Sequence, residues 1–431
     1  MKTKLLAGVV AACFAAPVLA QSNVTIYGIA DAGLMYAKNG GNDSKVKLVS
    51  GIADGSRLGF KGSEDMGGGY KAVFNLEARV ELDTGKQQTG NLSSNQGFAL
   101  TKGLNFAVPA AAGGAVTAGR LLAGVRGALQ PAVNVNINNA LFDRTSLVGL
   151  VTPVGAFLLG RMYTPGYEVF NNADVFESGT GGSWGGTVGG TGGLVTAGIA
   201  IRSDKSLQYR IELPNGLAGA LMYGTEKSGY IGLDKRSYGG NVRYKANGWD
   251  LGIGYNHGTN QVGERGLVST TVGGSYSIGD GKYFLGYHKQ KNDHSVIIRF
   301  AEETVAPTFA AFGPVLGPAL LGQLRTALVR NFFLDAASYQ VGMHYKVGAG
   351  RVMASVVRQD DKTVSNSDAT QYALGYDHNL SKRTDVYAVL AYIKNTNDGQ
   401  YAVGAASASG GFTSQPGESS RALQLGVRHR F

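Results

Sequence analysis

Apolar and polar residues alternate along much of the chain, in stretches of about ten residues each. The clearest of these stretches is residues 421–431. Its apolar face carries Leu423, Leu425, Val427, His429 and Phe431, and its other face carries Gln424, Gly426, Arg428 and Arg430. A tilted strand of that length spans a lipid bilayer, with one face toward lipid and the other toward water. The pattern therefore predicts transmembrane β-strands.

Sixteen such stretches follow one another along the sequence. They begin near Val24, Ser56, Tyr70, Phe142, Ala156, Ile199, Leu217, Ser237, Trp249, Val268, Lys282, Ser338, Arg351, Thr370, Thr384 and Arg421. Short connections at 63–69, 152–155, 214–216, 246–248, 279–281, 347–350 and 379–383 alternate with long ones. All ten prolines fall outside the stretches, as a closed hydrogen-bonded wall requires. We predict an all-β fold, a 16-stranded antiparallel transmembrane β-barrel with both termini on the side of the short turns.

A soluble all-β sandwich or β-helix is the main alternative fold. Tyrosines near the strand ends argue against it, because amphipathic rings favour a membrane interface. These are Tyr209, Tyr223, Tyr244, Tyr255, Tyr283, Tyr287, Tyr345 and Tyr392.

The first twenty residues have the composition of a secretory signal peptide. Lys2 and Lys4 precede an apolar run that ends in small residues at Ala20. An anchoring helix is the alternative, but the run is short and contains Pro17. Cleavage at Cys13, as in a lipoprotein, would leave too short an apolar segment. We predict a signal peptide at 1–20 and a single barrel domain at 21–431.

Composition narrows the functional classes further. The 431 residues are 43% hydrophobic and 16% charged, with a mean hydropathy of −0.05, which excludes a helical membrane bundle. A formal charge of +10 would raise nucleic acid as a partner, but export argues against one. Cys13 is the single cysteine, so the exported protein owes nothing to disulfides.

Five segments carry a resemblance to a known family. They are 24–31 (VTIYGIAD), 56–65 (SRLGFKGSED), 160–163 (GRMY), 379–384 (NLSKRT) and 426–431 (GVRHRF). Together they resemble the general diffusion porins of Gram-negative outer membranes, which are 16-stranded, usually trimeric, water-filled barrels. Two segments depart from the family pattern, namely long insertions at 96–141 and 295–337.

The resemblance implies a pore constriction. In such porins the third outer loop, here 163–198, folds into the lumen and faces a column of wall arginines. The column maps onto Arg57, Arg161 and Arg202, with Lys61 on the same face as Arg57. The facing loop carries Glu168, Asp174 and Glu177. A purely structural alternative is that these arginines neutralise the loop acids.

Alternation places most of this column toward the lumen. Arg57 and Lys61 oppose Leu58 and Phe60, which points them inward. Arg161 shares parity with the apolar residues before it, and an arginine facing mid-bilayer costs about 2–4 kcal/mol. We therefore predict a β-bulge at Gly160 that turns Arg161 inward.

No chemistry beyond permeation is expected. The six histidines lack metal-ligand spacing, and no serine–histidine pair suits a phospholipase barrel. We predict no enzyme activity, no metal and no cofactor, but an outer-membrane channel for small hydrophilic solutes that prefers anions. The alternatives are a substrate-specific channel for organic acids and a barrel adhesin or receptor.

Several partners are expected. Small residues on the outward face of the first strand, such as Gly28, Ala30 and Ala32, favour a homotrimer. The other partners would be outer-membrane lipid, lipopolysaccharide and, through the C-terminal strand ending in Phe431, the barrel-assembly machinery.

The two insertions are expected to pack against each other, a neighbouring subunit or the pore mouth. Helical spacing at Leu121, Leu122, Val125 and Leu129 and over 323–333 would otherwise leave apolar patches exposed. Pro307, Pro314 and Pro318 argue against a membrane helix in 305–321.

Overall fold

The computed structural model describes residues 23–41, 43–87, 101–129, 140–188, 200–229, 234–407 and 410–431. The expected signal peptide lies outside these residues. The strands are β1 Asn23–Asn39, β2 Lys45–Ser50, β3 Arg57–Gly67, β4 Tyr70–Arg79, β5 Thr145–Thr152, β6 Gly155–Tyr163, β7 Arg202–Glu212, β8 Leu217–Gly229 and β9 Arg236–Ala246. They continue with β10 Trp249–Thr259, β11 Arg265–Ile278, β12 Gly281–Asn292, β13 Leu334–Val347, β14 Gly350–Asp361, β15 Ala369–Asn379, β16 Thr384–Asn395 and β17 Ser420–Arg430.

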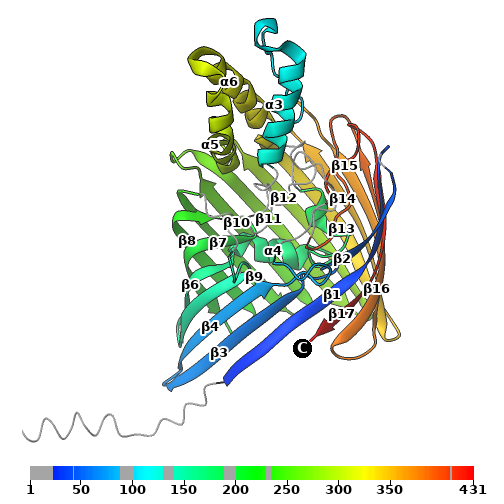
Figure 1. Ribbon diagram of the computed structural model, residues 1–431. Coiled ribbons are helices and arrows are strands. Elements are labelled where there is room, and N and C mark those ends of the chain that lie inside the picture. Colours follow the sequence, from blue (N-terminus) through cyan, green and yellow to red (C-terminus); the bar gives the residue numbers. More distant parts are fainter. Residues whose placement is uncertain are drawn as a thin grey trace, which may run out of the picture.

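These strands form one closed antiparallel barrel (Figure 1). Closure is made by β1, which pairs with β17 on one side and with both β2 and β3 on the other. Since β2 and β3 pair with successive parts of β1, together they occupy a single strand position. The predicted 16-stranded barrel is confirmed.

The wall has an apolar outer face and a polar inner face, as its alternation predicts. Along β17, Leu425 is 47% exposed on the side that lipid would cover, whereas neighbouring Gln424 is 0% exposed and lies inside. Unpaired backbone groups would be costly in lipid, and the continuous ladder satisfies them. The described helices include none long and apolar enough to cross a membrane.

The two insertions form a helical cap beyond one end of the barrel (Figure 1). The cap contains η1 Ala110–Ala112, α3 Gly114–Leu129, α5 Val296–Ala310 and α6 Gly313–Phe332. Val125 of α3, Val305 and Phe309 of α5 and Leu324 of α6 share one buried apolar cluster. The expectation that the insertions pack against each other is confirmed. The chain turns between α5 and α6 at Gly313, which has a φ of +79°.

The third outer loop folds inside the barrel, as predicted. It begins with α4 Pro165–Ala173, which packs against the inner face of β9, β10 and β11, and it continues through η3 Trp184–Gly186. Asn241 Nδ2 of β9 donates to the carbonyl of Pro165 at 2.9 Å. Further along the loop, the amide of Gly181 donates to Gln424 Oε1 of β17 at 2.6 Å. The loop therefore crosses the lumen and narrows it.

Candidate pore constriction

A row of guanidinium groups lies on the inner wall formed by β3, β4 and the residue before β5. Arg144 Nε donates to Glu77 Oε1 at 2.6 Å, and Arg57 Nη1 lies 3.9 Å from Glu77 Oε2. Glu77 thus joins two arginines that come from opposite sides of β4. Alternation places Arg57 and Glu77 on the polar face of the wall, and the hydrogen bond to Glu77 brings the Arg144 side chain to the same face.

The row continues to Arg202 at the start of β7. Arg144 Nη2 and Arg202 Nη2 both donate to the hydroxyl of Tyr163, at 3.1 and 2.7 Å. The guanidinium of Arg202 also lies over the Tyr163 ring, 4.3 Å from its centroid. Arg202 is only 4% exposed, so its guanidinium acts on ions in the lumen through its electric field and not by direct contact with bulk water.

Lys61 lies further along the same inner face and is exposed. Its ammonium is 5.0 Å from the centroid of the Tyr27 ring, and Tyr27 donates from its hydroxyl to Glu77 Oε2 at 3.1 Å. Lys61 is therefore connected to the guanidinium row through Tyr27 and Glu77.

The bulge predicted at Gly160 is present. The register between β6 and β7 shifts between Gly160 and Met162, and Gly160 has a φ of +131°. A side chain at Gly160 would meet the carbonyl of Ser146, so glycine is required there. Arg161 turns away from lipid, donates from Nε to the carbonyl of Asp143 at 2.7 Å and pairs with Asp204.

The structure therefore brings Arg57 and Arg202 together and adds two residues that sequence reasoning missed. Glu77 could have been found, because it alternates onto the polar face of its strand. Arg144 gave no such signal, because it shares parity with Val148 and Leu150, which are exposed on the outer face of the wall.

Two of the loop acids form ion pairs with the wall. Glu168 pairs with Arg210 and accepts from Asn241 Nδ2 at 3.2 Å. Glu177 accepts from Arg351 Nη1 and Nη2 at 2.7 and 3.0 Å. Burial raises the pKa of Glu177, but the hydrogen bonds and charge of Arg351 outweigh it and lower this pKa to about 2.

Asp174 does not face the lumen, which corrects the expected role of this residue as a constriction charge. Its side chain is 0% exposed, and its carboxylate accepts from the hydroxyl of Ser183 at 2.8 Å and from the amide of Trp184 at 3.0 Å. Burial raises the pKa of Asp174 to about 6, although these hydrogen bonds lower it. Sequence gives the charge of an acid but not whether the loop folds around it.

Phe431 lies on the outer face at the barrel seam. Its amide and carbonyl exchange hydrogen bonds with Gly28 of β1, both at 3.1 Å. A side chain at Gly28 would collide with the Phe431 ring and with the backbone carbonyl of Arg57, so packing within the barrel requires glycine there. Among the described residues, no group of histidine, cysteine, aspartate or glutamate is arranged to hold a metal ion.

Comparison with known proteins finds relatives and solved structures that are porins, in agreement with the barrel fold described above. The family model described as Gram-negative porin matches residues 7–398. Outer membrane porin protein 32 of Delftia acidovorans is 28% identical over 441 residues, covering all of both chains. The solved anion-selective porin from Comamonas acidovorans has a TM-score of 0.65 and 24% identity, covering 95% of this chain and all of that one. The trimer form of OmpT from Vibrio cholerae has a TM-score of 0.57 and 16% identity, covering 95% of this chain and 99% of that one.

Proposed function

The chain belongs to the Gram-negative porin family and forms a passive channel in the outer membrane, and from this premise we propose that its pore prefers anions. The observation that carries the proposal is the joined row of Arg57, Arg144 and Arg202 on one inner wall. The similar porin from Comamonas acidovorans is anion-selective, which also supports the proposal.

Charge around the constriction favours the same sign. Lys61 and the guanidinium row contribute four positive charges, while Glu77 and Asp54, which pairs with Arg57 at 3.1 Å, contribute two negative charges. On the loop side, Asp174 is buried and Glu177 is already paired with Arg351. One uncompensated charge at about 6 Å, with an effective dielectric constant of about 40–80, is worth roughly 0.7–1.4 kcal/mol. We expect anions to be favoured by a factor between about three and ten, and more strongly at low salt.

The test is the zero-current potential of single channels across a tenfold potassium chloride gradient. Arg57→Ala combined with Arg202→Ala should move the potential toward zero or reverse it. The matched control, Arg299→Ala with Arg325→Ala, removes two exposed arginines from the helical cap and should leave the potential unchanged. A double variant in the wall with the wild-type potential would overturn the proposal.

We also propose a homotrimer. Ala30 and Ala32 lie half-buried between the exposed apolar residues Ile26 and Leu34 of β1, a smooth face suited to a neighbouring barrel. Gly28 no longer supports this proposal, because Phe431 accounts for it. Light scattering of the purified protein would give the number of subunits, and a monomer would contradict the proposal.

Contacts with lipopolysaccharide are proposed for the outer face near the helical cap. Lys38 and Arg421 lie opposite each other on β1 and β17, and Lys394 is exposed on adjacent β16. Such cations suit lipid phosphates. Replacing all three with glutamine should reduce the lipopolysaccharide retained by the purified protein.

Export and assembly complete the proposal. Cleavage after Ala20 would give a mature N-terminus at Gln21, which N-terminal sequencing would detect. The barrel-assembly machinery would then recognise the C-terminal strand through Phe431.

A further inference from the structure

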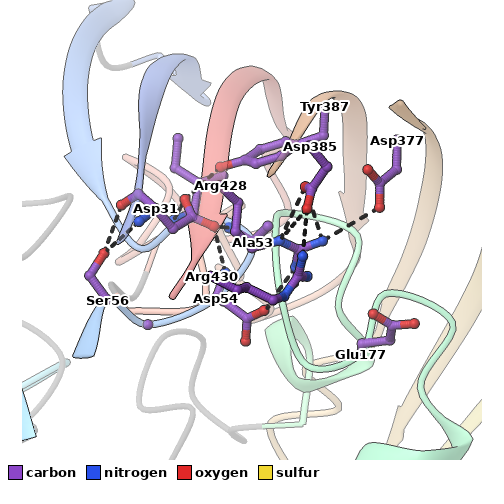
Figure 2. Close-up of polar contacts among 12 residues, drawn as sticks. Asp31, Ala53, Asp54, Ser56, Glu177, Asp377, Asp385, Tyr387, Arg428 and Arg430 are labelled. Atoms are coloured by element: carbon purple, nitrogen blue, oxygen red, sulfur yellow. Dashed lines mark hydrogen bonds and ion pairs between the residues drawn. The ribbon is translucent and has the colours of Figure 1, made fainter. Parts of the chain in front are cut away.

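Residues 51–56 connect β2 to β3 and lie against the inward loop, where the carbonyl of Ile52 accepts from the amide of Thr180 at 2.6 Å. Figure 2 shows the polar contacts of Ala53, Asp54 and Ser56 in this segment. We call it the inward shelf. Asp31 of β1 holds it, because its carboxylate accepts from the amides of Ile52, Ala53 and Asp54 at 3.1, 3.1 and 2.9 Å. Ser56 Oγ adds a hydrogen bond to the carbonyl of Asp31 at 2.8 Å. The shelf is thus fixed without any contact from the Asp54 side chain.

The Asp54 carboxylate lies between two guanidinium groups from different strands. Its Oδ1 accepts from Arg57 Nη2 at 3.1 Å, and its Oδ2 accepts from Arg428 Nη1 at 2.8 Å. Arg430 Nη2 lies 3.9 Å from the same Oδ2. Each carboxylate oxygen therefore has its own arginine, an arrangement that binds carboxylates strongly. The side chain remains 31% exposed.

Both arginines are oriented by other groups. Arg57 Nε donates to the carbonyl of Gly55 at 2.8 Å. Arg428 Nε donates to both oxygens of Asp385 at 3.1 and 3.2 Å, and its Nη2 reaches Asp377 at 3.5 Å, as Figure 2 shows. Removing the Asp54 side chain would therefore leave both guanidinium groups in place.

We propose that Arg57 and Arg428 form a binding site for small carboxylates in the pore, and that Asp54 occupies this site within the chain. A permeating carboxylate exchanges with Asp54 for the same two guanidinium groups, without any covalent step. Asp54 thereby keeps the site from retaining solutes, so that permeation stays fast. This inference deepens the proposed anion preference and rests on it.

The contacts around Asp54 distinguish this site from a structural ion pair. A structural pair would be needed to hold the shelf, whereas here backbone amides and Asp31 hold it. The site also extends the specificity-determining surface beyond the row on β3–β7, because Arg428 comes from β17 on the other side of β1.

The experiment compares single-channel conductance in potassium acetate and potassium chloride over a range of concentrations. In Asp54→Ala the acetate conductance should saturate at a concentration about tenfold lower than in the wild type. The reason is that Asp54 no longer competes with acetate for the charged hydrogen bonds of Arg57 and Arg428. Chloride conductance should show no such change. Asp65→Ala, which removes an exposed carboxylate at the far end of β3, is the matched control and should behave as the wild type.

Two further variants complete the test. Asp54→Asn keeps the side-chain volume, so it should fold even where alanine does not, and it should show the same direction of change. Adding Arg428→Gln to either variant should abolish the saturation. Identical acetate curves in the wild type and both Asp54 variants would overturn the binding site. Coinciding curves together with a wild type that selects chloride would contradict only the binding site. A wild type that selects cations would contradict the proposed anion preference itself.

Discussion

Asp174→Ala should loosen the inward loop more than any change at its exposed acids. The Asp174 carboxylate accepts from the amides of Phe176, Ser178 and Trp184, each at 3.0 Å, and from the hydroxyl of Ser183 at 2.8 Å. Alanine leaves three amides and one hydroxyl without this acceptor. A buried donor without a partner costs about 1–3 kcal/mol. Even with partial replacement by water, we expect the loop to lose at least about 3 kcal/mol.

The assay is the conductance and open-channel noise of single channels in planar bilayers at pH 7. A loosened loop should raise the noise and widen the distribution of conductance. The control is Glu177→Gln, whose side chain is 49% exposed, so that its ion pair contributes less. Wild-type conductance and noise in Asp174→Ala would refute the reasoning.

The pH dependence gives a second test of Asp174. Its pKa is raised in the folded loop, to about 6, so its ionised form is disfavoured there relative to a solvated aspartate near 3.9. The part of its stability that depends on protonation is fully present below about pH 4 and is lost as the pH rises through 6, whereas the hydrogen bonds of the loop amides to the carboxylate remain at pH 7. Noise in the wild type should therefore fall between pH 7 and pH 4, and Asp174→Ala should lack this dependence.

Three further predictions concern other parts of the molecule. The pKa of Glu177 is lowered, so the stability from its pair with Arg351 is present above about pH 4.5 and is lost as the pH falls toward 2. The open-channel noise of the wild type should therefore rise as the pH falls through that window, and the noise of Glu177→Gln should not. Leu324→Ala in the buried core of the cap should cost about 2–5 kcal/mol and make the insertions sensitive to protease on intact cells, unlike the exposed control Val315→Ala. Phe431→Asp should lower the amount of folded barrel in the outer membrane while the channels that form keep their conductance, and normal levels of this variant would contradict the assembly role.

The barrel wall could be predicted from sequence because lipid imposes a strict rule on alternate residues. The same rule predicted the bulge at Gly160, since an arginine on the lipid face is too costly. The packing of the two insertions followed from the need to cover apolar helical faces. In each case the physical constraint acts on residues close together in the chain.

The interior of the pore was less predictable, because contacts between distant residues determine it. The inward shelf depends on Asp31, more than twenty residues away from Asp54 in the chain, and on Arg428 of the last strand. Asp174 was wrongly expected at the lumen because a charge count does not show that the loop closes around it. Arg144 was missed because only the folded barrel brings it to Glu77.

The most direct test of the proposed function is the zero-current potential of the wild-type channel across a tenfold potassium chloride gradient, measured at high and at low salt. The guanidinium row predicts a potential with the sign of chloride selectivity, and a larger value at low salt, where screening is weaker. A potential with the sign of potassium selectivity would contradict it.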